Sequence, residues 1–202
     1  MIKDFKDAEV LNNIEKIFSC ANEVLNDTYN GYIKKEENAL TSAEENNREI
    51  ITLTNELYKQ IKESEKLDVE SYSLLYSLIG HFQKLKFDHD KLINSTFLKN
   101  KNLILFTDTA AVDIEDLFQG TRSIYNYLNE FMITKNPVLF RQIFRESTKY
   151  ELVSKRFVIE HEERLLQGIC SIKASTVYIQ MLDAFEDILW HLHFIAEEME
   201  RT

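Results

Sequence analysis

Hydrophobic residues recur at intervals of three and four along almost the whole chain, which is the spacing of an amphipathic helix. Near the beginning, this stripe comprises Leu11, Ile14, Phe18, Ala21, Leu25 and Tyr32. Near the end, it comprises Tyr178, Leu182, Phe185, Leu189, Leu192, Ala196 and Met199. A parallel stripe widens this last face and consists of Val177, Met181, Ala184, Ile188 and Ile195. A face of this width is expected to contact more than one neighbouring helix.

The pattern and its interruptions predict six helices. Pro137 suits the first turn of a helix, where the N–H that proline lacks is not needed, and Gly168 suits a helix C-terminus. Asp68 and either Ser171 or Ser175 are the expected N-caps. The predicted helices cover residues 5–33, 38–64, 68–95, 104–134, 137–166 and 173–201.

The chain also resembles itself when it is shifted by 103 residues. At this offset the first helix falls on the fourth, with Leu11 on Ile114, and the third falls on the sixth, with Phe82 on Phe185. The second and fifth helices do not align. Such a repeat predicts an all-α bundle of two three-helix units, residues 1–99 and 100–202, packed side by side.

Composition supports helices and excludes several other classes of protein. The 202 residues include four glycines and one proline, whereas average usage would give roughly 14 and about 10. Because turns depend on these two residues, a sandwich, a barrel or a Rossmann domain is excluded. Neither GxGxxG nor GxxxxGK[ST] occurs, which excludes glycine-rich phosphate-binding loops.

Charge and hydropathy restrict the partners and the compartment. The formal net charge of −10 argues against a nucleic-acid partner and against docking on anionic lipid. No apolar run is long enough to span a membrane, and the first residues lack the apolar stretch of a signal peptide. We therefore expect a cytoplasmic chain without direct membrane insertion, either a whole protein or the soluble part of a longer membrane protein.

The cysteines and histidines form none of the familiar motifs. No CxxC occurs, so a zinc ribbon or a redox pair is excluded, and Cys20 is expected to be a small core residue. No HExxH occurs, and no glutamate is followed three residues later by histidine, as a di-iron bundle requires. Neither GxSxG nor a cysteine with an adjacent base is recognisable, so the sequence predicts no enzyme.

The last predicted helix carries the candidate metal ligands. Asp183 and Asp187 lie four residues apart, with Glu186 beside them and His191 one turn beyond. Carboxylates at this spacing converge over one turn and can share a cation. Acidic helices also contain this spacing by chance, with Asp187 and His191 forming a simple carboxylate–imidazole contact or a solvated pair. From the residues alone both interpretations stay open.

The C-terminal third resembles a known family. The sequence reads His161-Glu-Glu-Arg-Leu-Leu-Gln-Gly168, and the final helix follows after a short linker. This stretch resembles the end of a PhoU-type domain, in the version appended to bacterial sodium/phosphate cotransporters. The matching positions are His161, Arg164, Leu165, Gly168, Tyr178, Leu182, Glu186, Ile188, His191, Ile195 and Ala196.

The resemblance implies a fold and a function. It implies a PhoU-like, spectrin-repeat-like bundle of two three-helix repeats, the architecture that the internal offset also predicts. It further implies a non-enzymatic regulator of phosphate transport that contacts a phosphate transporter or a sensor kinase. Such contact would bring a cytoplasmic protein to the inner face of the membrane. Whether the protein forms a homodimer stays open.

The chain departs from the family at its metal motif. Many PhoU-like proteins bind iron or zinc clusters through Glu/Asp-x-x-x-Asp on one helix of each repeat. Here Glu186 is followed by Trp190, and the aligned pair in the third helix is Gln83 and Phe87. We therefore expect no iron or zinc cluster and no other cofactor, although Asp183 preserves the spacing one turn away.

The aromatic pair at the lost positions allows two interpretations. Phe87 and Trp190 either line a partner-binding face or fill the seam between the two repeats, since large aromatics are usually buried. Two other functional classes also stay open, a metal-binding or metal-storage bundle and an unrelated helical adaptor.

Overall fold

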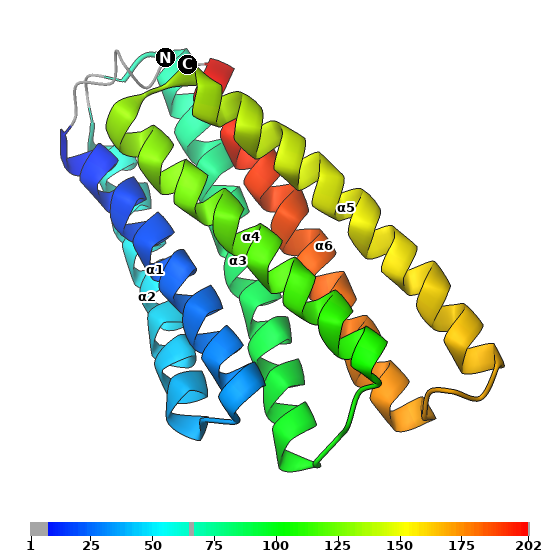
Figure 1. Ribbon diagram of the computed structural model, residues 1–202. Coiled ribbons are helices and arrows are strands. Elements are labelled where there is room, and N and C mark those ends of the chain that lie inside the picture. Colours follow the sequence, from blue (N-terminus) through cyan, green and yellow to red (C-terminus); the bar gives the residue numbers. More distant parts are fainter. Residues whose placement is uncertain (1–7, 65–66, 202) are drawn as a thin grey trace.

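The computed structural model describes residues 8–64 and 67–201, which form six α-helices and, within these ranges, no strand (Figure 1). The all-α class predicted from the sequence is confirmed. The helices are α1 (Ala8–Lys34), α2 (Glu37–Glu63), α3 (Val69–Lys101), α4 (Asp108–Thr134), α5 (Pro137–Leu166) and α6 (Ile172–Arg201).

The predicted helix ends are confirmed where a local signal marks them. The Asp68 carboxylate accepts a hydrogen bond from Ser71 N at 2.7 Å, and the Ser171 hydroxyl accepts one from Ala174 N at 3.2 Å. Pro137 lies in the first turn of α5, and Gly168 has a φ of +71°, which favours glycine at a helix end.

The third helix ends six residues later than predicted. α3 continues to Lys101, and the side-chain amides of Asn100 and Asn102 satisfy carbonyl groups at this end. Asn100 Nδ2 donates to Gly31 O at the end of α1 (2.8 Å), and Asn102 Nδ2 donates to Leu98 O (3.0 Å). Two asparagines can therefore lie at the end of a helix that packs on a neighbouring helix.

Four helices form the centre of the bundle. α3 packs along α6 and α1 packs on α4, while α2 covers α1 and α3 at one edge and α5 covers α4 and α6 at the other (Figure 1). Aromatic contacts fill the centre, as in the edge-to-face pair of Phe118 and Phe185 at 4.9 Å. No helix in the described ranges combines the length and hydropathy that crossing a membrane requires.

The offset between matching helices is not uniform along the chain. α3 and α6 begin 103 residues apart, as the sequence predicted. In contrast, α2 and α5 begin 100 residues apart, and α1 and α4 end 100 residues apart. The buried residues follow these offsets, with Phe18 matching Phe118 and Phe82 matching Phe185. The pairing of Leu11 with Ile114 was therefore wrong by three residues. The division into units at residues 99 and 100 stays a prediction.

Substitution by alanine is expected to have opposite effects on stability at two helical glycines. A Cβ at Gly120 would overlap the Tyr150 ring of α5, whereas a Cβ at Gly80 would meet nothing within 4 Å. We expect Gly120→Ala to lower the free energy of unfolding by about 1–3 kcal/mol through overpacking. Gly80→Ala should raise it by about 0.5–1 kcal/mol, because alanine favours helix. Urea unfolding measures both, and shifts of the same sign would contradict this packing.

Candidate functional site

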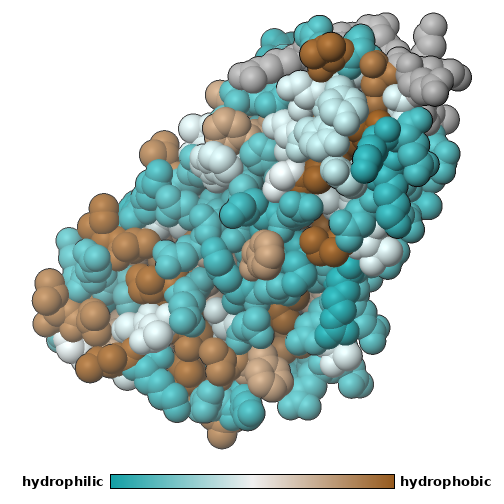
Figure 2. All heavy atoms as spheres, turned by 180° about the vertical axis from the view of Figure 1, so that it is seen from behind, coloured by the Kyte–Doolittle hydropathy of each residue, from teal (hydrophilic) through white to brown (hydrophobic). Residues whose placement is uncertain are grey.

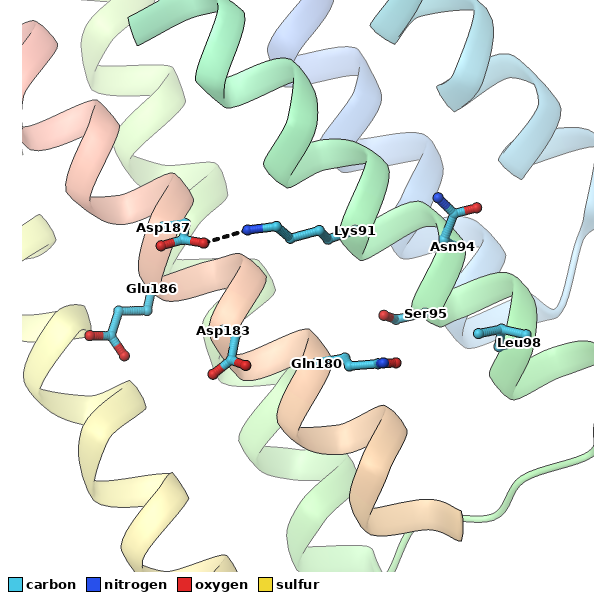
Figure 3. Close-up of a pocket in the computed structure, with 8 residues that line it drawn as sticks. All are labelled: Lys91, Asn94, Ser95, Leu98, Gln180, Asp183, Glu186 and Asp187. Carbon is cyan, nitrogen blue, oxygen red and sulfur yellow. Dashed lines mark hydrogen bonds and ion pairs between the residues drawn. The ribbon is translucent and has the colours of Figure 1, made fainter.

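A polar pocket of about 700 Å³ lies between α3 and α6 and contains three of the predicted acidic residues (Figure 3). The two helices run side by side, so side chains separated by some 90 residues in the sequence face each other across one seam. The residues that line the pocket are Lys91, Asn94, Ser95, Leu98, Gln180, Asp183, Glu186 and Asp187.

Lys91 connects the two helices electrostatically. Its Nζ donates to Asp187 Oδ2 at 2.6 Å and to Asp88 Oδ1 at 2.9 Å. The hydrogen bonds to Asp187 and then to Asp88 raise the pKa of the Lys91 ammonium, so Lys91 stays charged at neutral pH. The lysine therefore supplies a fixed positive charge between a carboxylate of α3 and one of α6.

Two histidines continue this network toward the interior. His191 Nε2 lies 3.5 Å from Asp88 Oδ2, and its Nδ1 lies 3.0 Å from His81 Nδ1. Burial, with a contribution from His81, lowers the pKa of His191 to about 4, and burial also lowers the pKa of His81. Both rings are therefore neutral at pH 7, and one nitrogen donates to the other.

The predicted acidic residues of α6 do not act together. Asp187 pairs with Lys91, and His191 lies against Asp88. These partners replace the direct contact between Asp187 and His191 that was one of the interpretations left open. Glu186 points toward α5, where its Oε1 lies 3.6 Å from Lys155 Nζ (Figure 3).

Asp183 remains on the rim of the pocket, and burial together with Asp187 raises its pKa. Ser95 is 3% exposed and lines the same pocket. The site is thus a groove in which Lys91, Asp187 and Glu186 each have an ion-pair partner. The Asp183 carboxylate and the Ser95 hydroxyl complete its polar lining.

This arrangement does not fit an iron or zinc cluster. Within residues 8–64 and 67–201, no group of three or more histidine, cysteine, aspartate or glutamate side chains is arranged to hold a metal ion. The Lys91 ammonium lies between Asp88 and Asp187, where it would repel a cation. That the protein binds no cluster in solution stays a prediction.

Phe87 and Trp190 are exposed rather than buried in the seam. Their exposed fractions are 57% and 45%. Trp190 packs on Phe194 with ring centroids 4.3 Å apart and lines a second hollow with Lys84 and Asp187. The two aromatics thus add apolar area to the charged surface of α3 and α6. Their use as a partner face stays a prediction.

A polar cluster at the other end of α6 was not recognised in the sequence. Asp113 Oδ2 accepts hydrogen bonds from the Tyr178 hydroxyl at 2.7 Å and from Arg164 Nη2 at 3.1 Å. The pair of Asp113 and Arg164 is largely buried, with side-chain exposures of 8% and 13%. It joins α4, α5 and α6 at a single point.

A cysteine–histidine pair lies beside this cluster and corrects the expectation that no cysteine has an adjacent base. Cys170 Sγ lies 3.9 Å from His161 Nδ1. Gly168 reverses the chain between them, since Gly168 N bonds to Leu165 O and Ile169 N to Arg164 O. In the sequence, the predicted C-terminal glycine of the helix was the feature that could have indicated this contact. The turn at such a glycine folds the following residues back onto the helix.

The fold and the site define an all-helical bundle in which two sets of three helices meet along α3 and α6. A solved structure shares this architecture, the crystal structure of PhoU from Pseudomonas aeruginosa. It matches with a TM-score of 0.83 and 12% sequence identity, over 96% of this chain and 97% of that chain. The fold is therefore PhoU-like. No protein-family model and no curated protein sequence matches the chain.

Proposed function

We propose that the protein is a non-enzymatic regulator of phosphate transport that acts by contact with a phosphate transporter or a sensor kinase. The observation that carries the proposal is the match of the whole chain, 96% covered, to the fold of PhoU. The sequence resemblance over residues 161–197 supports the same family independently of the fold.

The surface of α3 and α6 supports contact with a protein. Phe87 and Trp190 offer exposed apolar anchors. Lys84, Glu186 and Asp187 line one hollow together with Trp190 and place charge beside it. Apolar anchors with a polar rim are typical of protein interfaces. Asp187 is paired with Lys91 and Glu186 with Lys155, which suits a recognition surface better than acid–base chemistry.

The test is binding to the cognate phosphate transporter and sensor kinase, measured with purified components. We expect one of them to bind, and Phe87→Ala with Trp190→Ala to weaken binding about tenfold or more, as loss of interface anchors does. Val112→Ala on α4, which removes a side chain that is 64% exposed, is the matched control. If neither partner binds, the proposal is wrong and an unrelated adaptor function is favoured.

A metal-binding bundle is the second candidate, because Asp183 and Asp187 keep the one-turn spacing on the rim of the pocket. Metal analysis of protein purified without chelator separates the two functions. We expect less than one equivalent of iron or zinc, since Lys91 occupies the space between Asp88 and Asp187. Several tightly bound equivalents would favour the metal-binding function.

A further inference from the structure

The α3–α4 and α5–α6 connections lie at the same end of the bundle (Figure 1). A second pocket, of about 230 Å³, is lined by residues of both connections. Both Cys170 and the buried His161 line it, as do Thr107 and Ser171, the residues before α4 and α6. Leu105 and Tyr178 also contribute to the lining.

The thiol and the imidazole are held in contact within this pocket. Cys170 is a free, half-buried cysteine, and its Sγ lies 3.9 Å from His161 Nδ1. His161 is 2% exposed, and its ring is fixed against Tyr178 with centroids 4.5 Å apart. Its Nε2 is buried and has no hydrogen-bond partner among the described residues. The imidazole is therefore held by packing, and the thiol is its polar neighbour in the pocket.

Two helix N-termini open on this pocket. Cys170 lies two residues before α6, whose first-turn N–H groups point toward this end, and the N-terminus of α4 opens on the same pocket. Helix N-termini are common positions for reactive cysteines. Burial, and then Arg164, lower the pKa of His161, so the imidazole beside the thiol is neutral at pH 7.

Cys20 provides an internal comparison. It is also free and half-buried, but it lies in the middle of α1 and packs against the hydrophobic core. Burial, followed by the charges of Glu23 and Glu49, raises the pKa of the Cys20 thiol. Two cysteines of similar exposure therefore differ in their electrostatic surroundings and in the presence of a base.

We propose that Cys170 is a thiol modification site that reacts with small uncharged disulfides. His161 Nδ1 accepts the thiol proton, and the Cys170 sulfur attacks one sulfur of the disulfide. The sulfur–sulfur bond of the reagent breaks, a mixed disulfide forms on Cys170, and the departing thiolate takes up the proton. One thiol and one disulfide are consumed, and one thiol and one mixed disulfide are produced, so no further oxidant is needed.

The shape and polarity of this end define the ligand class. Exposed hydrophobic side chains contribute to the pocket lining, with Leu105 79% and Ile169 55% exposed. In the view from behind, hydrophobic atoms gather at the lower left, the end where the α5–α6 connection lies (Figure 2). A small neutral group suits this site better than a charged peptide.

The first experiment uses the unmodified protein and hydroxyethyl disulfide, with the adduct on each cysteine followed by mass spectrometry of peptides. We expect Cys170 to react roughly tenfold faster than Cys20 or more, because a positioned base and a helix N-terminus activate a thiol. Equal rates, or faster reaction at Cys20, would overturn the proposal. Oxidised glutathione should react more slowly than hydroxyethyl disulfide at Cys170, and the reverse order would overturn the ligand class.

A second experiment tests whether His161, rather than solvent exposure alone, determines the reactivity of Cys170. His161→Gln in a Cys20→Ser background should slow modification of Cys170 about tenfold, since general bases contribute at least that much. Iodoacetamide in urea, which exposes the thiol fully, should react equally with both forms. Circular dichroism confirms that the variant is folded, and if it does not fold, the comparison of Cys170 with Cys20 decides alone. An unchanged rate in a folded variant would show that His161 has no role in the reaction.

Discussion

Asp113→Ala should destabilise the protein by about 3–5 kcal/mol, the usual effect of removing one member of a buried ion pair. The substitution leaves the Arg164 guanidinium, 13% exposed, without its carboxylate, and it leaves the Tyr178 hydroxyl without its acceptor. In the part of the chain that the structure describes, Arg164 Nε already has no hydrogen-bond partner, so no nearby group is expected to replace the lost carboxylate. For a chain of this size the melting temperature should fall by roughly 10 °C.

Asp116→Ala is the matched control, one turn further along α4. Asp116 is exposed, and it accepts a single long hydrogen bond from the Tyr150 hydroxyl at 3.4 Å. Its removal should change the free energy of unfolding by less than about 0.5 kcal/mol. If both variants lose the same stability, the Asp113 cluster does not hold α4, α5 and α6 together.

A double-mutant cycle isolates the interaction between the two charges. Adding Arg164→Ala to Asp113→Ala removes the orphaned charge, so the double variant should lose less stability than the sum of the single variants. The expected coupling is about 1–3 kcal/mol. Urea unfolding with a constant m-value provides the measurement. Strict additivity would indicate that Arg164 reaches solvent when Asp113 is removed.

The fold was predictable because helix formation leaves local signals. Capping residues, a proline and a glycine fixed the ends of α3, α5 and α6 to within one residue where they were present. The alignment of the two halves of the chain was harder to predict from the sequence. A shift of three residues rotates an ideal helix by only about 60°, so a hydrophobic stripe nearly coincides with itself at offsets of 100 and 103.

The candidate site was predictable as a face but not as a set of contacts. The sequence placed Asp183, Asp187 and His191 on one side of α6, and they do lie along the seam with α3. The sequence could not show which residue of α3 pairs with Asp187. Lys91 is one of many lysines in the chain, and its role depends on the alignment of two helices that pack together across the bundle.

The residues that carried the family resemblance also have a structural explanation. His161, Arg164, Gly168 and Tyr178 all lie at the end of the bundle where α5 turns into α6. Arg164 and Tyr178 hold Asp113, and Gly168 allows the turn that brings Cys170 to His161. These four of the matching positions therefore coincide with a packed polar end of the molecule.

Acid should destabilise the protein well above the pH at which carboxylates protonate, and His89 should cause the largest part of the effect. His89 is completely buried on α3, and its Nε2 lies 2.9 Å from the Tyr125 hydroxyl of α4. Within residues 8–64 and 67–201, its Nδ1 has no hydrogen-bond partner. Burial lowers the pKa of His89 from 6.5 to about 3. The charged imidazolium is thus strongly disfavoured in the folded state.

The direction of the effect follows from proton linkage. Because the folded pKa of His89 lies below the unfolded value, its contribution to stability is fully present above pH 6.5 and is lost as the pH falls toward 3. Burial lowers the pKa of His191, His81 and His161 as well, so these residues act in the same direction. The raised pKa of Asp88 acts in the opposite direction, because the folded state then binds a proton more readily.

His89→Gln separates this histidine from the others. Glutamine can still bond to the Tyr125 hydroxyl but cannot titrate, so the loss of stability between pH 6.5 and 4 should be smaller than in the unmodified protein by roughly 2–3 kcal/mol. Tyr125→Phe removes the hydrogen bond and keeps the buried imidazole, so it should retain the original pH dependence. Urea unfolding at several pH values distinguishes the two variants. The same slope in His89→Gln and in the unmodified protein would mean that the α3–α4 contact opens to water before His89 is protonated, because a histidine that stays buried must contribute to this slope.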